Sequence, residues 1–125
     1  MRLTDDFFLI EHDGNTENGF YVELLTNPKH YIYKAHFPGN PITPGVCIIQ
    51  AAGELLENKL NRKLFLKSIK TIKFLSVITP KYGKTIKYVF SFITEDENGV
   101  NTRVLVRDDV TIYAKISMTF SNVQL

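Results

Sequence analysis

Apolar residues in the first quarter of the chain fall into two short runs that turn signals separate. The first run covers residues 7–12 and ends at the pair Asp13-Gly14, and the second covers residues 20–25. Runs of this length between turn signals are typical of strands, so the two are predicted to pair as a hairpin across a loose loop.

One longer apolar segment, from Pro44 to about Leu60, is predicted to form a helix. Within residues 46–56 only Gln50 and Glu54 are strongly polar, so the segment is apolar on nearly every side. A helix of this kind is normally buried, and the rest of the chain is expected to pack around it.

The later part of the chain alternates apolar and polar residues with the period of two that is typical of strands. Residues 80–83 and 95–99 have the composition of turns, and the second segment contains the strong hairpin pair Asn98-Gly99. Strands are predicted at residues 65–75, 85–94, 102–107 and 110–120. Short turns favour antiparallel pairing, and the sheet must cover the helix, which gives an α+β fold class with five or six strands.

Length and composition fit one globular domain that spans residues 1–125, since 44% of the residues are hydrophobic. One sheet on one helix leaves exposed edges and a thin core, so a dimer is expected. No apolar run is long enough to cross a membrane, and the N-terminus does not resemble a signal peptide. Cys47 is the only cysteine. These features favour a cytoplasmic protein without disulfides.

Charge and histidine spacing argue against two classes of ligand. The formal net charge of +2 is too small to indicate a protein that binds nucleic acid. Positive charge is concentrated between Lys59 and Lys73, either as a solvated face or as a docking surface for an acidic partner. His12 and His30 are expected at the surface or in turns. Neither has metal-ligand spacing with His36, so no metal or other cofactor is predicted.

The residues before the predicted helix combine a histidine with signals for a helix start. Thr43 is a suitable N-cap and Pro44 suits the first helical position, while Gly45 leaves the first backbone N–H groups unshielded. His36 lies upstream in a turn rich in proline and glycine. A histidine loop that leads into the positive end of a buried helix is typical of a functional site.

The motif HFPGNPITPGV at residues 36–46, with the apolar helix after it, resembles the β-hydroxyacyl-(acyl carrier protein) dehydratases of fatty-acid synthesis. The spacing of its histidine, prolines and glycines is specific. The resemblance extends weakly through the C-terminal strands, and the first 25 residues match less well. It implies a hotdog fold, in which a curved antiparallel sheet wraps around one central helix and two subunits form a dimer.

The resemblance also implies roles for residues of the motif. Such dehydratases remove water from a β-hydroxyacyl thioester that an acyl carrier protein presents on phosphopantetheine. By this resemblance His36 takes the α-proton, because the pKa of an imidazole lies near the working pH. The backbone N–H of Gly45 polarises the thioester carbonyl at the helix N-terminus. A carboxylic acid on the helix of the partner subunit, five residues after the glycine, helps the hydroxyl group leave.

This chain departs from the family pattern, because the fifth residue after Gly45 is Gln50. The family commonly has Glu there and Gln four residues later, whereas this chain has Gln50 followed by Glu54. Residues four apart share a helix face, so Glu54 is expected to point where Gln50 points, one turn deeper. An apolar environment would raise the pKa of Glu54 and keep its carboxyl protonated and able to donate.

Three functions therefore stay open. The first is a dehydratase that uses Glu54 as its acid. The second is a non-catalytic or heterodimer-dependent subunit, whose hotdog partner supplies the acid. The third is an acyl thioesterase, in which Gln50 or Glu54 positions water. The expected partners are an acyl carrier protein and an identical or different hotdog subunit. The acyl group is expected beside Val46, Ile49 and Gly53 and beside strand aromatics such as Phe90.

Overall fold

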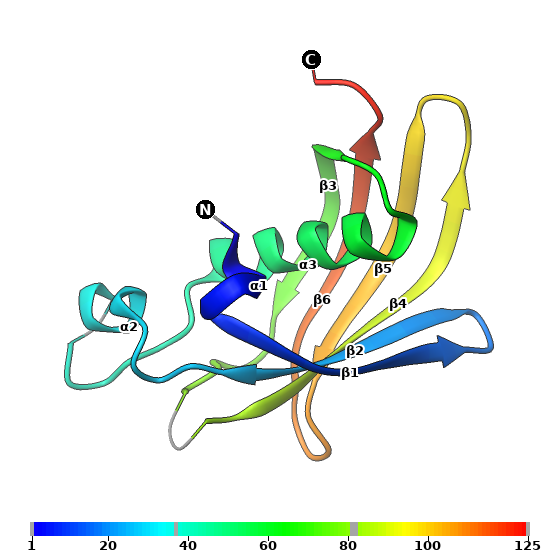
Figure 1. Cartoon of the computed structure of the whole chain (residues 1–125). Coiled ribbons are helices and arrows are strands. Elements are labelled where there is room, and N and C mark those ends of the chain that lie inside the picture. The colour runs from blue at the N-terminus through cyan, green and yellow to red at the C-terminus, as the bar shows by residue number, and fades with distance from the viewer. Residues whose placement is uncertain (1, 37, 81–82, 125) are drawn as a thin grey trace.

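A curved antiparallel sheet and one long helix form the body of the molecule (Figure 1), which a computed structural model describes for residues 2–36, 38–80 and 83–124. The strands are β1 (Phe8–Thr16), β2 (Gly19–Thr26), β3 (Phe65–Phe74), β4 (Thr85–Glu95), β5 (Gly99–Arg107) and β6 (Ile112–Ser121). The helices are α1 (Leu3–Asp6), α2 (Tyr31–Ala35) and α3 (Gly45–Leu60). The strand order is β1-β2-β4-β5-β6-β3, with neighbours antiparallel. The predicted α+β class, with the sheet wrapped around the helix, is confirmed.

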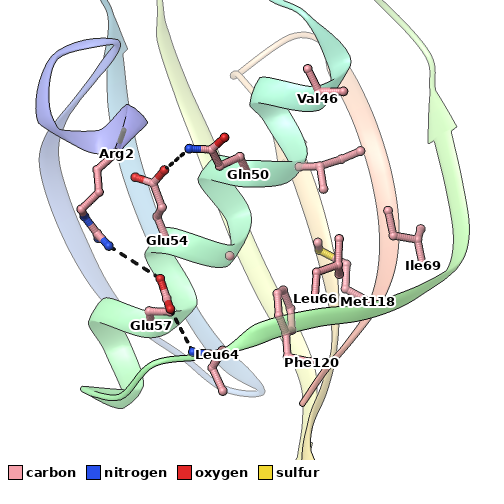
Figure 2. A pocket seen from close by; sticks show the side chains of 12 residues that line it. Arg2, Val46, Gln50, Glu54, Glu57, Leu64, Leu66, Ile69, Met118 and Phe120 are labelled. Carbon is pink, nitrogen blue, oxygen red and sulfur yellow. Dashed lines mark hydrogen bonds and ion pairs between the residues drawn. The ribbon is translucent and has the colours of Figure 1, made fainter. Parts of the chain in front are cut away.

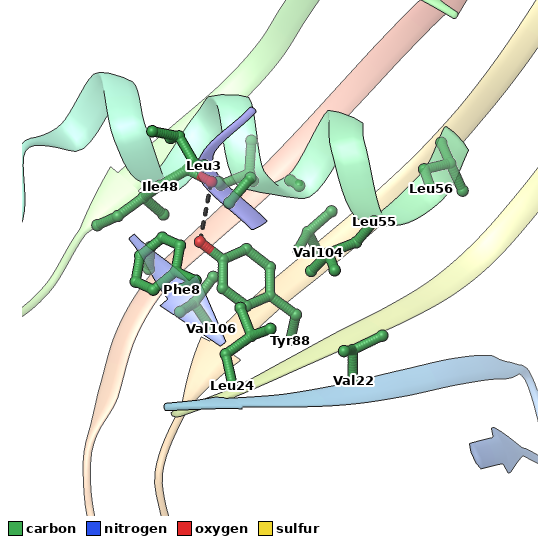
Figure 3. Packing of buried hydrophobic residues seen from close by; sticks show 14 of the residues in the cluster. Leu3, Phe8, Val22, Leu24, Ile48, Leu55, Leu56, Tyr88, Val104 and Val106 are labelled. Atoms are coloured by element: carbon green, nitrogen blue, oxygen red, sulfur yellow. Dashed lines mark hydrogen bonds between the residues drawn. The ribbon is translucent and has the colours of Figure 1, made fainter. Parts of the chain in front are cut away.

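The core lies between α3 and the concave face of the sheet, where alternate residues of the central strands point at the helix. Tyr88 is fully buried there among aliphatic and aromatic side chains, and its hydroxyl donates a hydrogen bond of 3.0 Å to the carbonyl oxygen of Ile48 (Figure 3). Burial raises the pKa of Tyr88 well above its ordinary value. Ala51 and Ala52 are also fully buried, and their small side chains let α3 lie close to the sheet.

The first hairpin turns later than the sequence predicts. β1 continues through Asp13-Gly14, and the chain reverses at residues 17–18, just before Gly19. Gly19 packs directly against β4, so that a Cβ at this position would lie 2.0 Å from the carbonyl oxygen of Phe90. Only glycine fits so close to the neighbouring backbone, and this contact outweighs the turn preference of Asp13-Gly14.

β5 likewise begins earlier than predicted, at Gly99 rather than at residue 102. The turn before it is closed by Asp96, whose Oδ1 accepts the N–H groups of Asn98 and Gly99 at 2.7 and 3.0 Å. A Cβ on Gly99 would lie 1.8 Å from the carbonyl oxygen of Phe120. The glycine therefore serves strand pairing as well as the turn.

Two short helices, α1 and α2, are missing from the elements that the sequence predicts. His30 caps the N-terminus of α2, since its ring Nδ1 accepts the N–H of Ile32 at 3.2 Å. His30 closes the turn that begins at Asn27, as expected, but it is buried, because its ring packs against Phe7 and its Nε2 lies 3.1 Å from the Asp6 carboxylate. His12 is exposed, as expected. None of the helices in the described ranges is both long and apolar enough to cross a membrane.

Candidate active site

A cavity of about 560 Å³ lies between α3 and the β3 margin of the sheet (Figure 2). Its polar side chains come from α3 and the N-terminal segment, whereas β3 and β6 contribute apolar ones. The lining residues are Arg2, Val46, Ile49, Gln50, Gly53, Glu54, Glu57, Leu64, Leu66, Ile69, Met118 and Phe120. They include Val46, Ile49 and Gly53, which were expected beside the acyl group, so the cavity offers that group an apolar wall. Phe90, expected there too, is fully buried in the core and is not among the residues that line this cavity.

The N-terminus of α3 borders this cavity and has no side-chain cap. The helix begins at Gly45, and its cap residue is Pro44, so the prediction of Thr43 as the N-cap is wrong. The Thr43 hydroxyl instead lies 2.8 Å from the Tyr33 hydroxyl. The first-turn N–H groups of α3 therefore present the positive end of the helix without a side-chain acceptor from its cap residue. A Cβ on Gly45 would lie 2.9 Å from the Phe74 ring, so glycine lets β3 approach the helix start.

His36 is the half-buried residue that ends α2, with its backbone N–H bonded to the carbonyl oxygen of Ile32 at 3.0 Å. Its ring Nδ1 lies 2.9 Å from the carbonyl oxygen of Ile42. A carbonyl oxygen only accepts, so Nδ1 carries the proton, and in the neutral ring the lone pair is on Nε2. Among the described residues, His36 is not one of those that line the cavity beside Gln50.

The contact between Tyr33 and Thr43 holds the loop that joins His36 to α3. Both side chains are buried, and burial raises the pKa of Tyr33 to about 12. A phenol with that pKa stays protonated near neutral pH, so the hydrogen bond between the two hydroxyls is kept. The bond ties α2 to the segment that leads into Gly45.

Tyr33→Phe is expected to lower the free energy of unfolding by about 1 to 2 kcal/mol, because the buried Thr43 hydroxyl loses its partner. Urea unfolding measures the change. Tyr21→Phe, at a half-buried ring of β2 whose hydroxyl has no hydrogen bond within the described residues, is the matched control and should change the free energy by less than about 0.5 kcal/mol. Equal stability of the Tyr33 variant and wild type would show that the bond does not hold the loop.

Gln50 and Glu54 share one face of α3, as predicted, and are joined by a hydrogen bond. The Gln50 Nε2 donates to Glu54 Oε2 at 2.9 Å (Figure 2). Because a carboxylate only accepts hydrogen bonds, the nitrogen of the Gln50 amide, rather than its oxygen, faces Glu54. Both residues belong to the polar wall of the cavity, so the structure brings together two of the four residues that the sequence singled out.

Glu54 also holds the N-terminal segment against α3. Its Oε2 accepts the N–H of Leu3, and its Oε1 accepts both the N–H and the hydroxyl of Thr4, each at 2.9 Å. One turn further on, Glu57 forms an ion pair of 3.6 Å with Arg2 and accepts the N–H of Leu64 at 2.9 Å. The two acids are therefore engaged in structural contacts rather than being an ordinary solvated stripe.

The expectation of a raised pKa for Glu54 is wrong. Burial by itself would raise this pKa, since Glu54 is only 5% exposed, but hydrogen bonds from Thr4, Leu3 and Gln50 outweigh burial and lower it. Four donors stabilise the carboxylate form. Glu54 is accordingly ionised near neutral pH and has no proton to donate.

Sequence reasoning missed the N-terminal residues of this site. Arg2, Leu3 and Thr4 reach Glu54 and Glu57 across separations of fifty residues or more, such as 51 residues for the Leu3 bond. No local pattern relates segments so far apart. The only available signal was a carboxylate on a helix that is apolar on nearly every other side, since a carboxylate requires a partner when it is buried. No group of three or more His, Cys, Asp or Glu side chains among the described residues is arranged to hold a metal ion.

Comparison with known proteins agrees with the fold and the motif. The family model of ApeI-like proteins, described as ApeI dehydratase, matches residues 12–113. The chain is 34% identical to a 3-hydroxyacyl-(acyl-carrier-protein) dehydratase FabZ of Sulfurovum sp. over 102 residues, which cover 70% of this chain and 67% of that protein. It is 30% identical to a FabZ of Chlamydia trachomatis over 118 residues, or 87% of this chain and 76% of the relative.

Among solved structures, the fold is similar to that of the dehydratase heterocomplex ApeI:P from Xenorhabdus doucetiae. The TM-score is 0.72 at 18% sequence identity, and the match covers 91% of this chain and 97% of that chain. At this level of identity the likeness shows the fold, and the predicted hotdog architecture is confirmed.

Proposed function

Because the chain belongs to the ApeI-like dehydratase family, we propose that it takes part in the dehydration of β-hydroxyacyl thioesters carried by an acyl carrier protein. In this proposal His36 is the base, and Gly45 stabilises the thioester oxygen. The helix of a second hotdog subunit supplies the acid beside His36, and Gln50 lies at the matching position of this chain's own helix. FabZ relatives are dehydratases that act on 3-hydroxyacyl carrier proteins, which supports the substrate class.

The proposed reaction begins when Nε2 of His36 removes the proton on the α-carbon. The electron pair moves toward the thioester carbonyl, whose oxygen accepts a hydrogen bond from the Gly45 N–H at the positive end of α3. Collapse of this charge forms the double bond and breaks the bond between the β-carbon and its hydroxyl oxygen. The hydroxyl must gain a proton to leave as water.

The source of that proton decides between the functions that the sequence leaves open. Gln50 can hold a hydroxyl group by hydrogen bonds, but a neutral amide is no proton donor at neutral pH. Glu54 has a lowered pKa and is bound by four donors, which argues against it as the acid. The similar X. doucetiae structure is a dehydratase heterocomplex, which supports a partner subunit as the source.

One observation carries the proposal: the uncapped start of α3 and Gln50 border the same apolar cavity. An anion-stabilising helix end beside an apolar chamber suits an acyl thioester, whose carbonyl and acyl chain need those two environments. The chamber is lined by residues of β3, the end strand of the sheet, so a second subunit that pairs there would lie beside it.

The test uses a β-hydroxyacyl thioester of acyl carrier protein, with intact-protein mass spectrometry to follow the loss of one water. Gln50→Glu is expected to gain about 10²-fold in rate over the wild-type chain assayed alone, because it adds an acid at the position that the family uses. The Glu54 carboxylate would raise the pKa of the new acid and favour its protonated form. Gln50→Met, similar in size but without hydrogen-bonding groups, is the control and should not gain activity.

Three results separate the alternatives. Activity of Gln50→Glu alone, with wild type active only beside a second hotdog subunit, supports a partner-dependent dehydratase. Full activity of wild type alone would mean that this chain needs no outside acid. Release of free thiol without loss of water, in wild type and variant alike, would contradict dehydration and identify a thioesterase.

A further inference from the structure

The cluster of positive charge predicted between Lys59 and Lys73 divides into two parts in the structure. Lys59 and Arg62 lie at the end of α3, where they contact Asn15 and Glu95. The other part lies along β3, whose sequence FLKSIKTIKF contains three lysines and no acidic residue. Lys67, Lys70 and Lys73, here called the lysine edge, are all exposed.

β3 is an end strand of the sheet, paired on one side with β6. The register with β6 shifts at Lys67 and again at Lys70, while Lys73 pairs with Lys115 of β6. Within the part of the chain that the structure describes, no ion pair involves the lysine edge. This margin therefore presents several cations and no neutralising carboxylate.

Apolar side chains gather at the same margin. Leu66, Phe74 and Leu75 are each about half exposed, and Val77 and Val46 are 60% and 74% exposed. Leu66 and Ile69 also line the cavity beside α3 (Figure 2). Exposed apolar residues that continue into a cavity indicate a surface that another protein covers.

Self-pairing is a poor way to cover this margin. When two copies of β3 pair antiparallel about a two-fold axis, a residue that faces a given partner in the other copy is itself faced by the symmetry-related pair. Because the lysines are three residues apart, every register that overlaps the middle of β3 puts a lysine of one copy opposite, or one residue from, a lysine of the other. Like charges on facing strands destabilise pairing, and edge lysines are a known barrier to it.

We propose that the lysine edge selects the second subunit: β3 pairs with a hotdog subunit whose own edge strand carries carboxylates, in preference to another copy of this chain. The proposal rests on the two-subunit site of the proposed function and specifies its partner. An acidic edge strand supplies the charge that the lysines lack, and the same subunit covers the apolar margin and the open side of the cavity.

An engineered copy of this chain provides the probe. Changing Lys67, Lys70 and Lys73 to Glu gives a subunit with the same fold and an acidic edge. Wild type and this triple variant, distinguished by mass, are mixed at low salt and examined by native mass spectrometry. The mixed dimer is expected to be about tenfold or more tighter than either homodimer, since several cross-strand charge pairs act in the same direction.

Two controls separate edge charge from total charge and from misfolding. Changing the exposed residues Lys29, Lys34 and Lys63 to Glu alters the net charge equally, away from the strand, and should give only statistical mixing with wild type. Changing the lysine edge to Gln removes the repulsion without adding acid. This neutral variant should form a tighter homodimer than wild type, and raising the salt should tighten the wild-type homodimer by screening.

The opposite results overturn the proposal. Statistical mixing of wild type with the acidic-edge variant, or a wild-type homodimer that salt and the Gln variant leave unchanged, would show that the lysine edge selects nothing. Larger assemblies that salt disperses would instead indicate pairing of β3 with the exposed acids Glu11 and Asp13 on β1 of the next copy. None of these association experiments measures turnover. A negative result in them therefore leaves the dehydratase proposal standing, and a negative dehydration assay leaves the association constants unchanged.

Discussion

Replacement of His36 with alanine is expected to lower the rate of dehydration, or of the reverse hydration, by about 10²- to 10⁴-fold. The α-proton is weakly acidic, and the proposed site offers no other base at that position. The Nδ1 contact with the Ile42 carbonyl already puts the lone pair on Nε2, so the ring is set to accept a proton. The half-buried position of His36 suggests that the variant keeps the fold.

The control for this experiment is His12→Ala, at an exposed histidine of β1 outside the motif. The His12 variant should keep the wild-type rate in the same assay, with circular dichroism confirming that both variants are folded. A folded His36 variant with a near-normal rate would remove the base from the proposed mechanism. The assay must use the chain together with whichever second subunit gives the wild type its activity.

Elements whose identity depends on nearby residues could be predicted from the sequence. α3 is apolar on nearly every side, and the central strands alternate apolar and polar residues with a period of two. In each case the residues of the segment itself indicate whether it forms a helix or a strand. The motif around His36 and Gly45 likewise combines turn residues with a helix start at fixed spacing. Element type and order follow from these local signals.

Features that depend on distant contacts could not be predicted. The position of the first hairpin turn depends on Gly19 packing against Phe90 of another strand. The short helices α1 and α2 have no amphipathic period and are held by tertiary contacts, such as the ring of His30 against Phe7. The same holds for the ionisation of Glu54, because three of its four hydrogen-bond donors belong to Leu3 and Thr4 near the N-terminus.

The exchange of Gln50 and Glu54 relative to the family pattern has a structural explanation. A buried carboxylate at Glu54 fastens the N-terminal segment and orients the Gln50 amide. Gln50 is a neutral hydrogen-bonding group at the position where the dehydratases that the motif resembles commonly have Glu. The cavity thus keeps a polar wall, and in the proposed mechanism the proton comes from a second subunit.

Glu54→Ala is expected to lower the free energy of unfolding by about 3 kcal/mol at neutral pH, because the N–H groups of Leu3 and Thr4 lose their acceptor in a buried setting. Urea unfolding at equal protein concentration measures the change. Asp5→Ala, an exposed acid in α1, is the control and should change the free energy by less than about 0.5 kcal/mol.

The dependence of this difference on pH tests the charge of Glu54 directly. Hydrogen bonds lower the folded pKa of Glu54 below the ordinary value of 4.5, so the carboxylate stabilises the fold above that pH, and the stabilisation is lost as the pH falls through the folded pKa. The difference between wild type and Glu54→Ala should therefore be largest near neutral pH and shrink in acid. A difference that grows as the pH falls would mean that the folded protein holds Glu54 protonated. In that case Glu54 could serve as the general acid after all, and the second subunit would not be needed to supply the proton.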